Sequence, residues 1–454
     1  MRLVVVANRA PLRKTETGWT PAIGGLATAL MPVLEEQGGV WVSMGEDGDP
    51  TGRQPYPEED PRFVVRRVAL SEEELNNYYY GMANRVLWPV SHYMVQHLEL
   101  EGAFMRDYRS VNKRFAEATL DEYEEGDYVW VQDYHLMLVP ELLRQRQPQA
   151  NIAFFWHIPW PAMEVFRILP WARELIRGML GCDLIGFHVE EYVENFLEGA
   201  RVLLGAEVDG NRVQWEGREI RVEAHPIGID VAHFEKTASG ADVQEEVKAL
   251  RNELGVEQVV VGVDRLDYTK GIHARLLAFE ELLQEQPEWR ERVAFLQVAT
   301  PSRTEVESYK QLKREVDEVV GRINGMYAGD GWTPVHYRYR TYTQEELCIF
   351  YRAADVALIT PLRDGMNLVT QEFIAANEGG ILILSELTGA AYLLPEALQA
   401  NPYDHEGLRK VLREALEMSP EERRERLDQL KQKVRNLDVH QWAEGFLEAM
   451  TAAA

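Results

Sequence analysis

The chain has 454 residues, of which 46% are hydrophobic and 27% charged, a composition typical of soluble globular proteins with sizeable cores. This length predicts two or three domains. The net charge of −26 argues against general nucleic-acid binding, which needs a basic surface, so any phosphate must be bound by a local set of Arg, Lys and backbone N–H groups.

The sequence contains no feature that predicts a membrane segment. No apolar stretch approaches the roughly 20 residues that a membrane helix needs. The start "MRLVVVANR" has too short an apolar run for a signal peptide and is typical of a first strand, so we expect a cytoplasmic protein with no membrane partner. The two cysteines, Cys182 and Cys348, lie far apart in apolar surroundings, which predicts buried thiols rather than a disulfide or a metal pair.

Short runs rich in Val, Ile and Leu alternate with helical patterns along nearly the whole chain. Such runs predict parallel strands that are buried on both faces, and their alternation with helices predicts a doubly wound α/β fold. The strands are expected at 3–7, 39–43, 127–132, 152–158, 183–187, 259–266, 293–299, 335–340, 355–360 and 380–385. Helices are expected between them, including 25–37, 273–287 and 302–323.

The alternation restarts after "HPIGID" (225–230), where a Pro and a Gly interrupt the pattern. We therefore expect two doubly wound, Rossmann-like domains, 1–228 and 229–435, that face each other across a cleft. In such folds the ligand binds at the carboxyl ends of the strands. A C-terminal helix, 436–454, could pack back on the first domain through Trp442 and Phe446.

Polar residues at the expected strand ends therefore carry the chemical information. Arg9 follows the first strand, and Gly24 and Gly25 precede a helix whose first N–H groups would attract phosphate. Two glycines alone are more typical of a tight turn before a helix. The sequence contains neither a Walker loop nor a complete G-x-G-x-x-G, so it supports neither a P-loop nucleotidase nor an ordinary dehydrogenase.

Two further strands end in Asp133, His135 and His157. These side chains could bind a metal, hydrogen-bond sugar hydroxyls, or be core histidines satisfied by the backbone. No close HxxxH or Cys/His spacing supports a metal, so we expect no metal and no cofactor. Tyr79 and Trp88 lie in an aromatic segment that fits either a sugar platform or ordinary core.

In the second half, "DRLDYTKGI" (264–272) presents Arg265 and Lys270 where a buried strand meets a helix. Two cations there could clamp a diphosphate and stabilise it as a leaving group. The alternative is a structural ion pair with Asp264 or Asp267. Arg303 repeats this geometry after the next strand.

The segment "TPLRDGMNLVTQEF" (360–373) follows the strand 355–360. Its Gly-Met-Asn-Leu turn could present successive N–H groups, including those of Asn367 and Leu368, to an anion. Glu372, in the helix that follows, could accept hydrogen bonds from a ribose diol. The charged pair Arg363 and Asp364 stands where the strand ends, and Arg363 has no assigned role.

Together these stretches resemble the trehalose-6-phosphate synthases, retaining glycosyltransferases of family 20 with the GT-B architecture. The resemblance runs in family order over nearly the whole chain. The motifs that carry it are "NR" (8–9), "GGLA" (24–27), "VLWP" (86–89), "QDYHL" (132–136), "FFWHIPWP" (154–161), "LIGFH" (184–188), "PIGID" (226–230), "DRLDYTKG" (264–271), "PSR" (301–303), "GRING" (321–325), "GWTP" (331–334) and "TPLRDGMNLV" (360–369).

The resemblance implies transfer of glucose from a nucleoside diphosphate glucose to glucose 6-phosphate, giving α,α-trehalose 6-phosphate. It implies a front-face mechanism in which Arg265, Lys270, His157 and Asp364 form the catalytic set. The implied donor site consists of Gly24, Gly25, His157, Arg265, Lys270, Asn367, Leu368 and Glu372, with Asp364 also on the donor glucose. The implied acceptor site consists of Arg9, Trp41, Tyr79, Trp88, Asp133 and Arg303.

Two departures from the family pattern concern specificity. After Trp41 the chain has "VSMGEDG" (42–48) where relatives usually carry Gly-Trp-Ser-Gly, which affects the acceptor side. Gln371 stands where many relatives carry Lys beside the ribose-binding Glu, which affects the donor nucleotide. The donor nucleotide (UDP, ADP or GDP), regulation and the oligomeric state, homo-oligomers included, stay open.

Three alternatives to this function also stay open. A glucosylglycerol-phosphate synthase would use glycerol 3-phosphate, and a pseudo-glycosyltransferase would couple cyclitols. A catalytically silent sugar-phosphate sensor belongs to a different class, but it has less need of a cation clamp for a leaving group.

Overall fold

The computed structural model describes residues 2–15, 18–21, 25–45, 52–329 and 331–453. It divides into two compact units: unit 1 consists of Met1–Ile227 and Val439–Ala454, and unit 2 consists of Gly228–Asp438. Each unit contains its own large, mainly parallel sheet, so the α/β fold class predicted by the alternating pattern is confirmed.

The sheet of unit 1 has ten strands in the order β10-β11-β12-β9-β8-β7-β1-β4-β6-β5. Its centre is parallel, with Val5 of β1 between Trp41 of β4 and Trp130 of β7. The strands are β1 (Leu3–Val6), β4 (Gly39–Met44), β5 (Gly52–Tyr56), β6 (Phe63–Val68), β7 (Tyr128–Gln132), β8 (Asn151–Phe155), β9 (Leu184–Phe187), β10 (Glu207–Asp209), β11 (Arg212–Trp215) and β12 (Arg218–Ala224). A separate hairpin pairs β2 (Leu12–Thr15) with β3 (Gly18–Pro21).

The apolar-run pattern does not predict the strands at the two ends of this sheet. β5, β10 and β11 pair antiparallel with their neighbours. In β11 and β6, buried residues alternate with more exposed ones, so neither forms a continuous apolar run.

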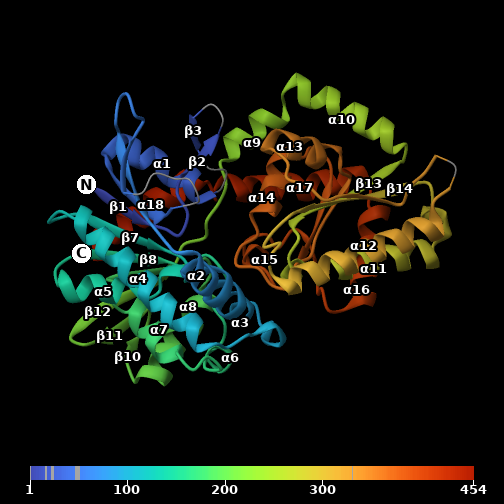
Figure 1. Cartoon of the computed structure of the whole chain (residues 1–454). Helices are drawn as coiled ribbons and strands as arrows, with labels where there is room; N and C mark the ends of the chain where they lie inside the picture. The colour runs from blue at the N-terminus through green and yellow to red at the C-terminus, as the bar shows by residue number, and fades with distance from the viewer. Residues whose placement is uncertain (1, 16–17, 22–24, 46–51, 330, 454) are drawn as a thin grey trace. The chain divides into compact units, whose positions relative to one another are not determined.

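Helices surround this sheet (Figure 1). The longest, α4, buries one apolar face that includes Phe104, Tyr108 and Phe115. The helical elements of unit 1 are α1 (Gly25–Gln37), α2 (Glu72–Leu75), the π-helix η1 (Asn76–Leu87), α3 (Trp88–Ser91), η2 (Val95–His97), α4 (Gly102–Glu122), η3 (Tyr134–Leu136), α5 (Val139–Arg146), α6 (Met163–Phe166), α7 (Ala172–Met179), α8 (Glu190–Gly199), η4 (Ala200–Leu204) and α18 (Val439–Ala453).

The last helix, α18, belongs to unit 1 although unit 2 precedes it in the sequence. Figure 1 shows it in red among the blue and cyan elements of that unit. Phe446 stacks on Trp130 with ring centroids 4.6 Å apart, and the Trp442 indole donates a 3.2 Å hydrogen bond to the His225 carbonyl. A Cβ on Gly186 would lie 2.5 Å from the Phe446 ring, so this glycine leaves the space that α18 fills.

The sheet of unit 2 is entirely parallel, in the order β15-β14-β13-β16-β17-β18. The strands are β13 (Gln258–Arg265), β14 (Val293–Thr300), β15 (Val335–Arg338), β16 (Val356–Ile359), β17 (Ile381–Ser385) and β18 (Leu398–Ala400). β16 and β17 are buried along their whole length, which is why they appear in the sequence as uninterrupted apolar runs.

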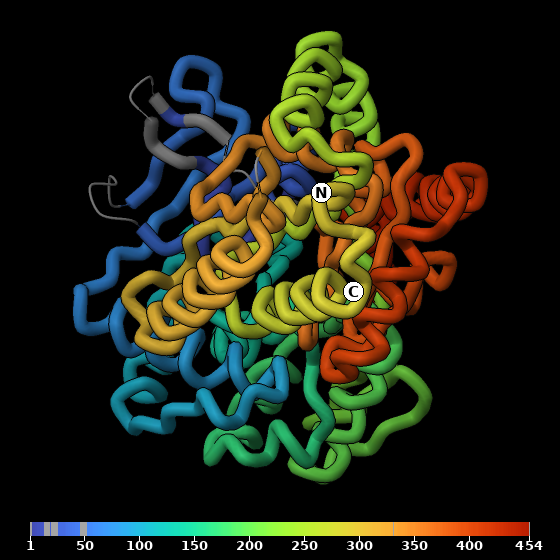
Figure 2. Tube along the Cα trace, turned by 90° about the vertical axis from the view of Figure 1, so that its right-hand side faces the viewer, coloured from blue at the N-terminus to red at the C-terminus, as the bar shows by residue number. Residues whose placement is uncertain are grey.

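Helices cover this sheet in two groups. α11, α12 and α16 pack together, and Figures 1 and 2 both show α11 beside α12. α9, α13, α14 and α17 form the second group. The bounds are α9 (Val231–Ala238), α10 (Ala241–Leu254), η5 (Tyr268–Lys270), α11 (Ile272–Glu285), η6 (Pro287–Trp289), α12 (Glu307–Tyr327), α13 (Gln344–Ala353), α14 (Leu368–Ala376), α15 (Gly389–Leu393), α16 (His405–Glu417) and α17 (Pro420–Arg435).

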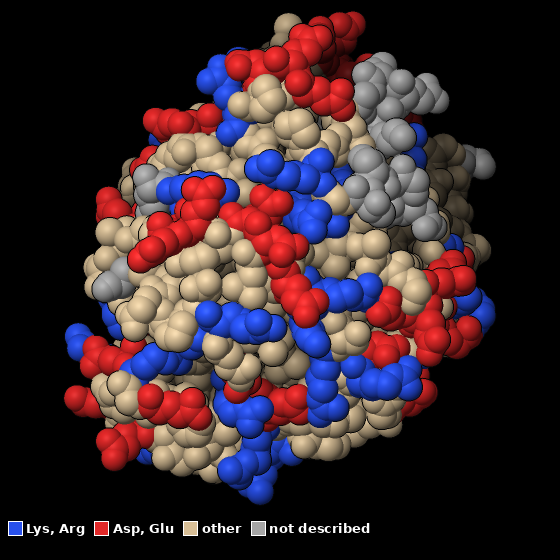
Figure 3. Space-filling view, turned by 60° about the vertical axis from the view of Figure 1, so that its left-hand side comes forward, with Lys and Arg blue, Asp and Glu red and all other residues tan. Residues whose placement is uncertain are grey.

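The expected helix over 302–323 was wrong at its start, because α12 begins at Glu307. Arg303 has a positive φ of 46°, outside the helical region, and the chain therefore leaves β14 through a loop. None of the described helices is long and apolar enough to cross a membrane. On the face shown in Figure 3, Lys and Arg lie interspersed with Asp and Glu.

Candidate active site

In unit 1 three of the predicted site residues follow the neighbouring parallel strands β1, β7 and β8. The carboxyl ends of these strands lie along one edge of the sheet, and Arg9, Asp133 and His157 come just after them. Gly25 is the first residue of α1, whereas Gly24 lies outside the described residues.

Three members of the predicted acceptor set meet around Arg9. Its Nη2 donates a 3.0 Å hydrogen bond to the Tyr79 hydroxyl, and the Trp41 indole donates one of 3.0 Å to the Arg9 carbonyl. The Tyr79 ring stacks on His135 at 5.8 Å. The exposed Arg9 guanidinium thus bonds to Tyr79 of η1, while Trp41 of β4 holds the Arg9 backbone.

The two tryptophans of the predicted acceptor set are nearly fully buried. Trp41 is 1% exposed and Trp88 is 4% exposed. Trp88 packs on His92, with ring centroids 4.1 Å apart. Both side chains are therefore enclosed by protein, and Trp41 contacts the acceptor set through its hydrogen bond to the Arg9 carbonyl.

Asp133 and His157 are held together at the ends of β7 and β8. The His157 N–H donates to Asp133 Oδ1 at 3.2 Å, and His157 Nε2 lies 2.9 Å from Gln132 Oε1. His188 Nε2 lies 3.2 Å from the His157 carbonyl. Desolvation lowers the pKa of His157 well below its ordinary value, with His188 adding to the effect, so the ring is neutral at pH 7. A neutral imidazole can exchange hydrogen bonds with a sugar hydroxyl.

Among the described residues, no three His, Cys, Asp or Glu side chains lie close enough together to hold a metal ion. Asp133 bonds to the backbone of His157. Cys182 and Cys348 are both buried and form no disulfide, as predicted.

In unit 2 the central feature is the contact between Lys270 and Asp364. Lys270 ends η5, which follows β13, and Asp364 follows the adjacent strand β16. The Lys270 ammonium donates to Asp364 Oδ2, which also accepts a 3.0 Å hydrogen bond from Asn367 Nδ2. The lysine and aspartate side chains are 10% and 15% exposed, so the ion pair is largely shielded from water.

Asn367 is also the N-cap of α14. Its φ of 74° is left-handed, and its Oδ1 accepts a 3.3 Å hydrogen bond from the Thr370 N–H. The helix begins at Leu368, so N–H groups at its start are oriented along its axis toward this end. Such a terminus carries partial positive charge and suits a phosphate group.

Glu372 accepts a 2.7 Å hydrogen bond from the Tyr351 hydroxyl. Burial raises the pKa of Glu372, and the Tyr351 hydrogen bond opposes this increase. Tyr351 lies on α13, and no pattern in the sequence pointed to it.

Arg303 is anchored by Asp267, which is fully buried. Asp267 Oδ2 accepts hydrogen bonds of 2.8 Å from Arg303 Nη1 and from the Tyr309 hydroxyl, and Oδ1 accepts one of 3.0 Å from the Thr269 N–H. Burial alone would raise the pKa of Asp267, but Arg303, Arg265 and the Thr269 hydrogen bond lower it well below its usual range. The carboxylate therefore remains ionised and fixes Arg303 near the end of β14.

The sequence offered Asp264 or Asp267 as ion-pair partners for Arg265 and Lys270, and the lysine pairs with neither. Lys270 pairs with Asp364, while Asp264 pairs with Arg275 and Asp267 with Arg303. Arg265 is exposed at the end of β13, close enough to lower the pKa of Asp267.

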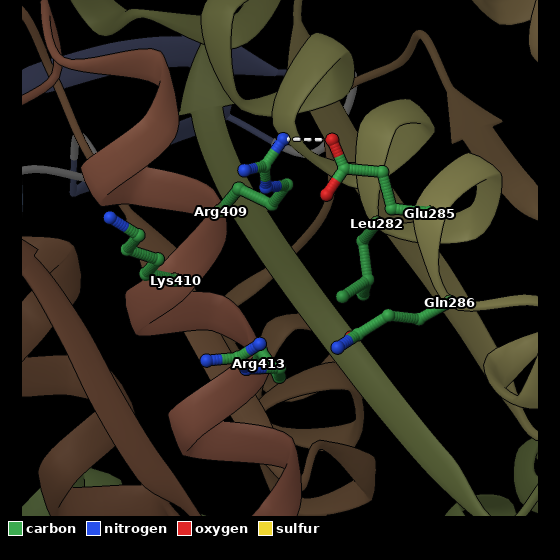
Figure 4. Close-up of a pocket in the computed structure, with 6 residues that line it drawn as sticks. All are labelled: Leu282, Glu285, Gln286, Arg409, Lys410 and Arg413. Atoms are coloured by element: carbon green, nitrogen blue, oxygen red, sulfur yellow. Dashed lines mark hydrogen bonds and ion pairs between the residues drawn. The ribbon is translucent and has the colours of Figure 1, made fainter.

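A small pocket lies elsewhere in unit 2, between α11 and α16 (Figure 4). It is lined by Leu282, Glu285, Gln286, Arg409, Lys410 and Arg413. Arg409 pairs with Glu285, and Lys410 pairs with Glu406 at 2.7 Å. None of the predicted site residues lines it, so this pocket is not the candidate active site.

Residues 1–452 match the sequence pattern of glycosyltransferase family 20. The chain belongs to this family. A trehalose-6-phosphate synthase of Mycobacterium avium (strain 104) is 43% identical over 98% of this chain and 94% of its own length.

Two solved structures are similar to the chain over almost their whole length. An E. coli structure bound with UDP-2-fluoro glucose has a TM-score of 0.92 and 34% identity, covering 99% of each chain. An alpha,alpha-trehalose-phosphate synthase (UDP-forming) from Burkholderia xenovorans, in complex with glucose-6-phosphate, has a TM-score of 0.89 and 33% identity, covering 99% of this chain and 100% of its own. The likeness extends to the GT-B fold class that the resemblance implied.

The two sequence departures from the family pattern, residues 42–48 and Gln371, belong to different units. Val42 to Met44 end β4, whereas 46–48 lie outside the described residues. Gln371 is fully buried on α14, where a lysine would bury a charge. Arg363 lies close enough to Tyr403 to oppose the rise that burial causes in the tyrosine pKa.

Proposed function

We propose that this protein is a trehalose-6-phosphate synthase that transfers glucose from UDP-glucose to glucose 6-phosphate with retention at the anomeric carbon. The observation that carries the proposal is the Lys270–Asp364 contact at the ends of adjacent strands β13 and β16, in a chain of glycosyltransferase family 20. A cation and a sugar-binding carboxylate placed together suit a reaction in which a glycosyl bond to a phosphate breaks.

The donor site consists of residues that suit the parts of a nucleoside diphosphate sugar. Arg265 and Lys270 bind the diphosphate, with N–H groups of Asn367 and Leu368 at the start of α14. Glu372, held by Tyr351, binds the ribose. Asp364 and the neutral His157 bind the glucose, and the segment at Gly24 and Gly25 assists at the diphosphate.

The acceptor site uses arginines for the phosphate of glucose 6-phosphate. Arg9, Tyr79 and Arg303 bind this phosphate, because guanidinium groups match its oxygens. Asp133 binds a sugar hydroxyl, and Trp41 and Trp88 support the surrounding wall.

Catalysis in this proposal needs no protein nucleophile, so two catalytic carboxylates are not required. The acceptor hydroxyl attacks the face that the diphosphate leaves, and a leaving phosphate oxygen takes its proton. The protein positions both sugars and stabilises the charge that develops on the diphosphate. We place the reaction in the cytoplasm, where cells keep phosphorylated sugars.

The choice of UDP is supported by the E. coli relative, whose structure is bound with UDP-2-fluoro glucose. The choice of glucose 6-phosphate is supported by the Burkholderia xenovorans relative, whose structure contains it. Gln371 and residues 42–48, where the sequence departs from the family pattern, are the positions that we propose to affect the choice of donor nucleotide and of acceptor.

The proposal is tested by a panel of donors and acceptors with nucleotide release as the measurement. UDP-, ADP- and GDP-glucose are each combined with glucose 6-phosphate, glycerol 3-phosphate, a cyclitol phosphate or no acceptor. We expect UDP release to be fastest with glucose 6-phosphate, and the product to be trehalose 6-phosphate. Fastest release with another acceptor would contradict the proposed acceptor, and no release with any pair would favour the sugar-phosphate sensor.

Replacing Arg9 with glutamine is expected to raise the KM for glucose 6-phosphate by about 10- to 100-fold, because one charge-assisted hydrogen bond to the phosphate is lost. Arg62→Gln is the control, since Arg62 is exposed and pairs only locally with Asp60 at 2.7 Å. Steady-state kinetics with varied glucose 6-phosphate measure both. An unchanged KM in Arg9→Gln would exclude Arg9 from the phosphate site.

A further inference from the structure

Arg275 lies in the first turn of α11 and is completely buried, with 0% exposure. Its guanidinium makes three hydrogen bonds. Nη2 donates to Asp264 Oδ2 at 2.6 Å and to the Lys270 carbonyl at 2.5 Å, and Nη1 donates to the Leu358 carbonyl at 2.8 Å. Arg275 is not among the residues that touch substrate in the proposed function.

These three partners belong to the segments that carry the proposed donor site. Asp264 is at the end of β13, Lys270 ends η5, and Leu358 is in β16, shortly before Asp364. One side chain thus joins the lysine-bearing loop to the strand that leads to the aspartate.

The same two segments contact each other directly beside this bridge. The Leu362 N–H donates a 2.7 Å hydrogen bond to the Thr269 carbonyl. Gly271 has a φ of 66°, and a Cβ there would lie 2.3 Å from the Thr360 carbonyl oxygen. The segments are therefore too closely packed to shift independently of each other.

A buried ion pair is not the most stabilising choice for a core. Desolvation of both charges offsets most of their attraction, and an apolar pair of similar volume is often equally stable. What arginine adds is a rigid planar fork that fixes several acceptors at once. Gly262 leaves room for this fork, since a Cβ there would lie 2.8 Å from Arg275 Nη1.

We propose that Arg275 is a positioning residue for glucosyl transfer, which sets the Lys270 ammonium at the diphosphate by fixing the Lys270 carbonyl against Asp264 and β16. This inference rests on the proposed function. Arg275 holds the backbone carbonyl of Lys270 itself, so a change at Arg275 displaces the ammonium without touching substrate. A lysine at position 275 keeps the charge opposite Asp264 but lacks the fork that spans both carbonyls.

The test is a double-mutant cycle that combines Arg275→Lys with Lys270→Ala, and Arg275→Met is made in parallel. We expect Arg275→Lys to reduce turnover about 10- to 100-fold in the wild-type background and less than about threefold when Lys270 is already alanine. UDP affinity, measured by calorimetry without acceptor, should likewise fall in Arg275→Lys when Lys270 is present and change little when Lys270 is already alanine. Because UDP carries the charge of the leaving group, its binding reports on the Lys270 ammonium.

Arg423→Met is the matched control, because Arg423 is also a buried arginine of unit 2 that binds the carbonyls of Ala415 and Leu416. It should lower the melting temperature without changing turnover of the folded protein. Arg275→Met could fail to fold, and Arg275→Lys then carries the test alone.

Equal losses from Arg275→Lys in both backgrounds, or no loss in either, would overturn the positioning role. Wild-type protein that binds UDP but transfers no glucose to any acceptor would instead contradict the proposed function. In that case the UDP titrations of the four proteins in the cycle still decide the role of Arg275.

Discussion

Lys270→Ala is expected to lower turnover about 100- to 1000-fold while changing the affinity for UDP-glucose less than tenfold. The reason is that the charge on the diphosphate grows as the glycosyl bond breaks, so the ammonium binds the transition state more strongly than the donor. Asp364 retains the hydrogen bond from Asn367 in this variant. Steady-state kinetics give the turnover, and calorimetry with UDP-glucose gives the affinity.

Lys410→Ala is the control for this variant. Lys410 is also a lysine of unit 2 in an ion pair, with Glu406 at 2.7 Å, but its side chain is 59% exposed. Its removal should leave turnover unchanged. If Lys270→Ala retained wild-type turnover, the assignment of Lys270 to the diphosphate would be wrong, as it would be if donor affinity fell as much as turnover.

The second large effect is expected at Asp267. Asp267→Asn should lower the free energy of unfolding by about 3–5 kcal/mol, because it leaves the charge of Arg303 without its buried carboxylate partner. It should also raise the KM for glucose 6-phosphate, since Arg303 would lose its anchor. Urea unfolding and acceptor kinetics measure the two effects. Asp317→Asn is the control, because Asp317 forms an ion pair with Lys313 on the surface of α12.

The lowered pKa of Asp267 predicts how the stability difference between wild type and Asp267→Asn depends on pH. A carboxyl whose pKa is lower in the folded than in the unfolded state contributes its full stability above its unfolded value, about 3.9. That contribution is lost as the pH falls below this value toward the folded pKa. The stability gap between wild type and Asp267→Asn should therefore be constant from about pH 5 upward and shrink below pH 4. A gap that widened on acidification would contradict the ion-pair assignment.

The pattern of apolar runs predicted where several site residues lie, but it did not predict which residues they contact. Arg265, Lys270 and Asp364 were expected at strand ends because uninterrupted apolar runs precede them, and the structure has them there. The same pattern did not predict β6 or β11, in which buried and exposed residues alternate. Nor did it show the loop at Arg303, where the backbone leaves the helical region.

Contacts between segments distant in sequence could not be predicted from local patterns. Sequence reasoning offered Asp264 and Asp267 as partners for Lys270 because they are close in sequence, but the lysine bonds to Asp364, 94 residues away. The hydrogen bonds from the Tyr351 hydroxyl to Glu372 and from Arg275 to the Leu358 carbonyl are further examples. Each depends on which strands are neighbours and on their register.

The sequence by itself determined the α/β class, the ends of the central strands and the family, because each of these follows from local runs and motifs. The tertiary structure alone decided that Lys270 meets Asp364 and that Asp267 holds Arg303. The physical reason is that burial of a short apolar run is a local property of the chain. The partner of a charged side chain is set by the packing of whole strands and helices, which brings distant segments within hydrogen-bonding distance.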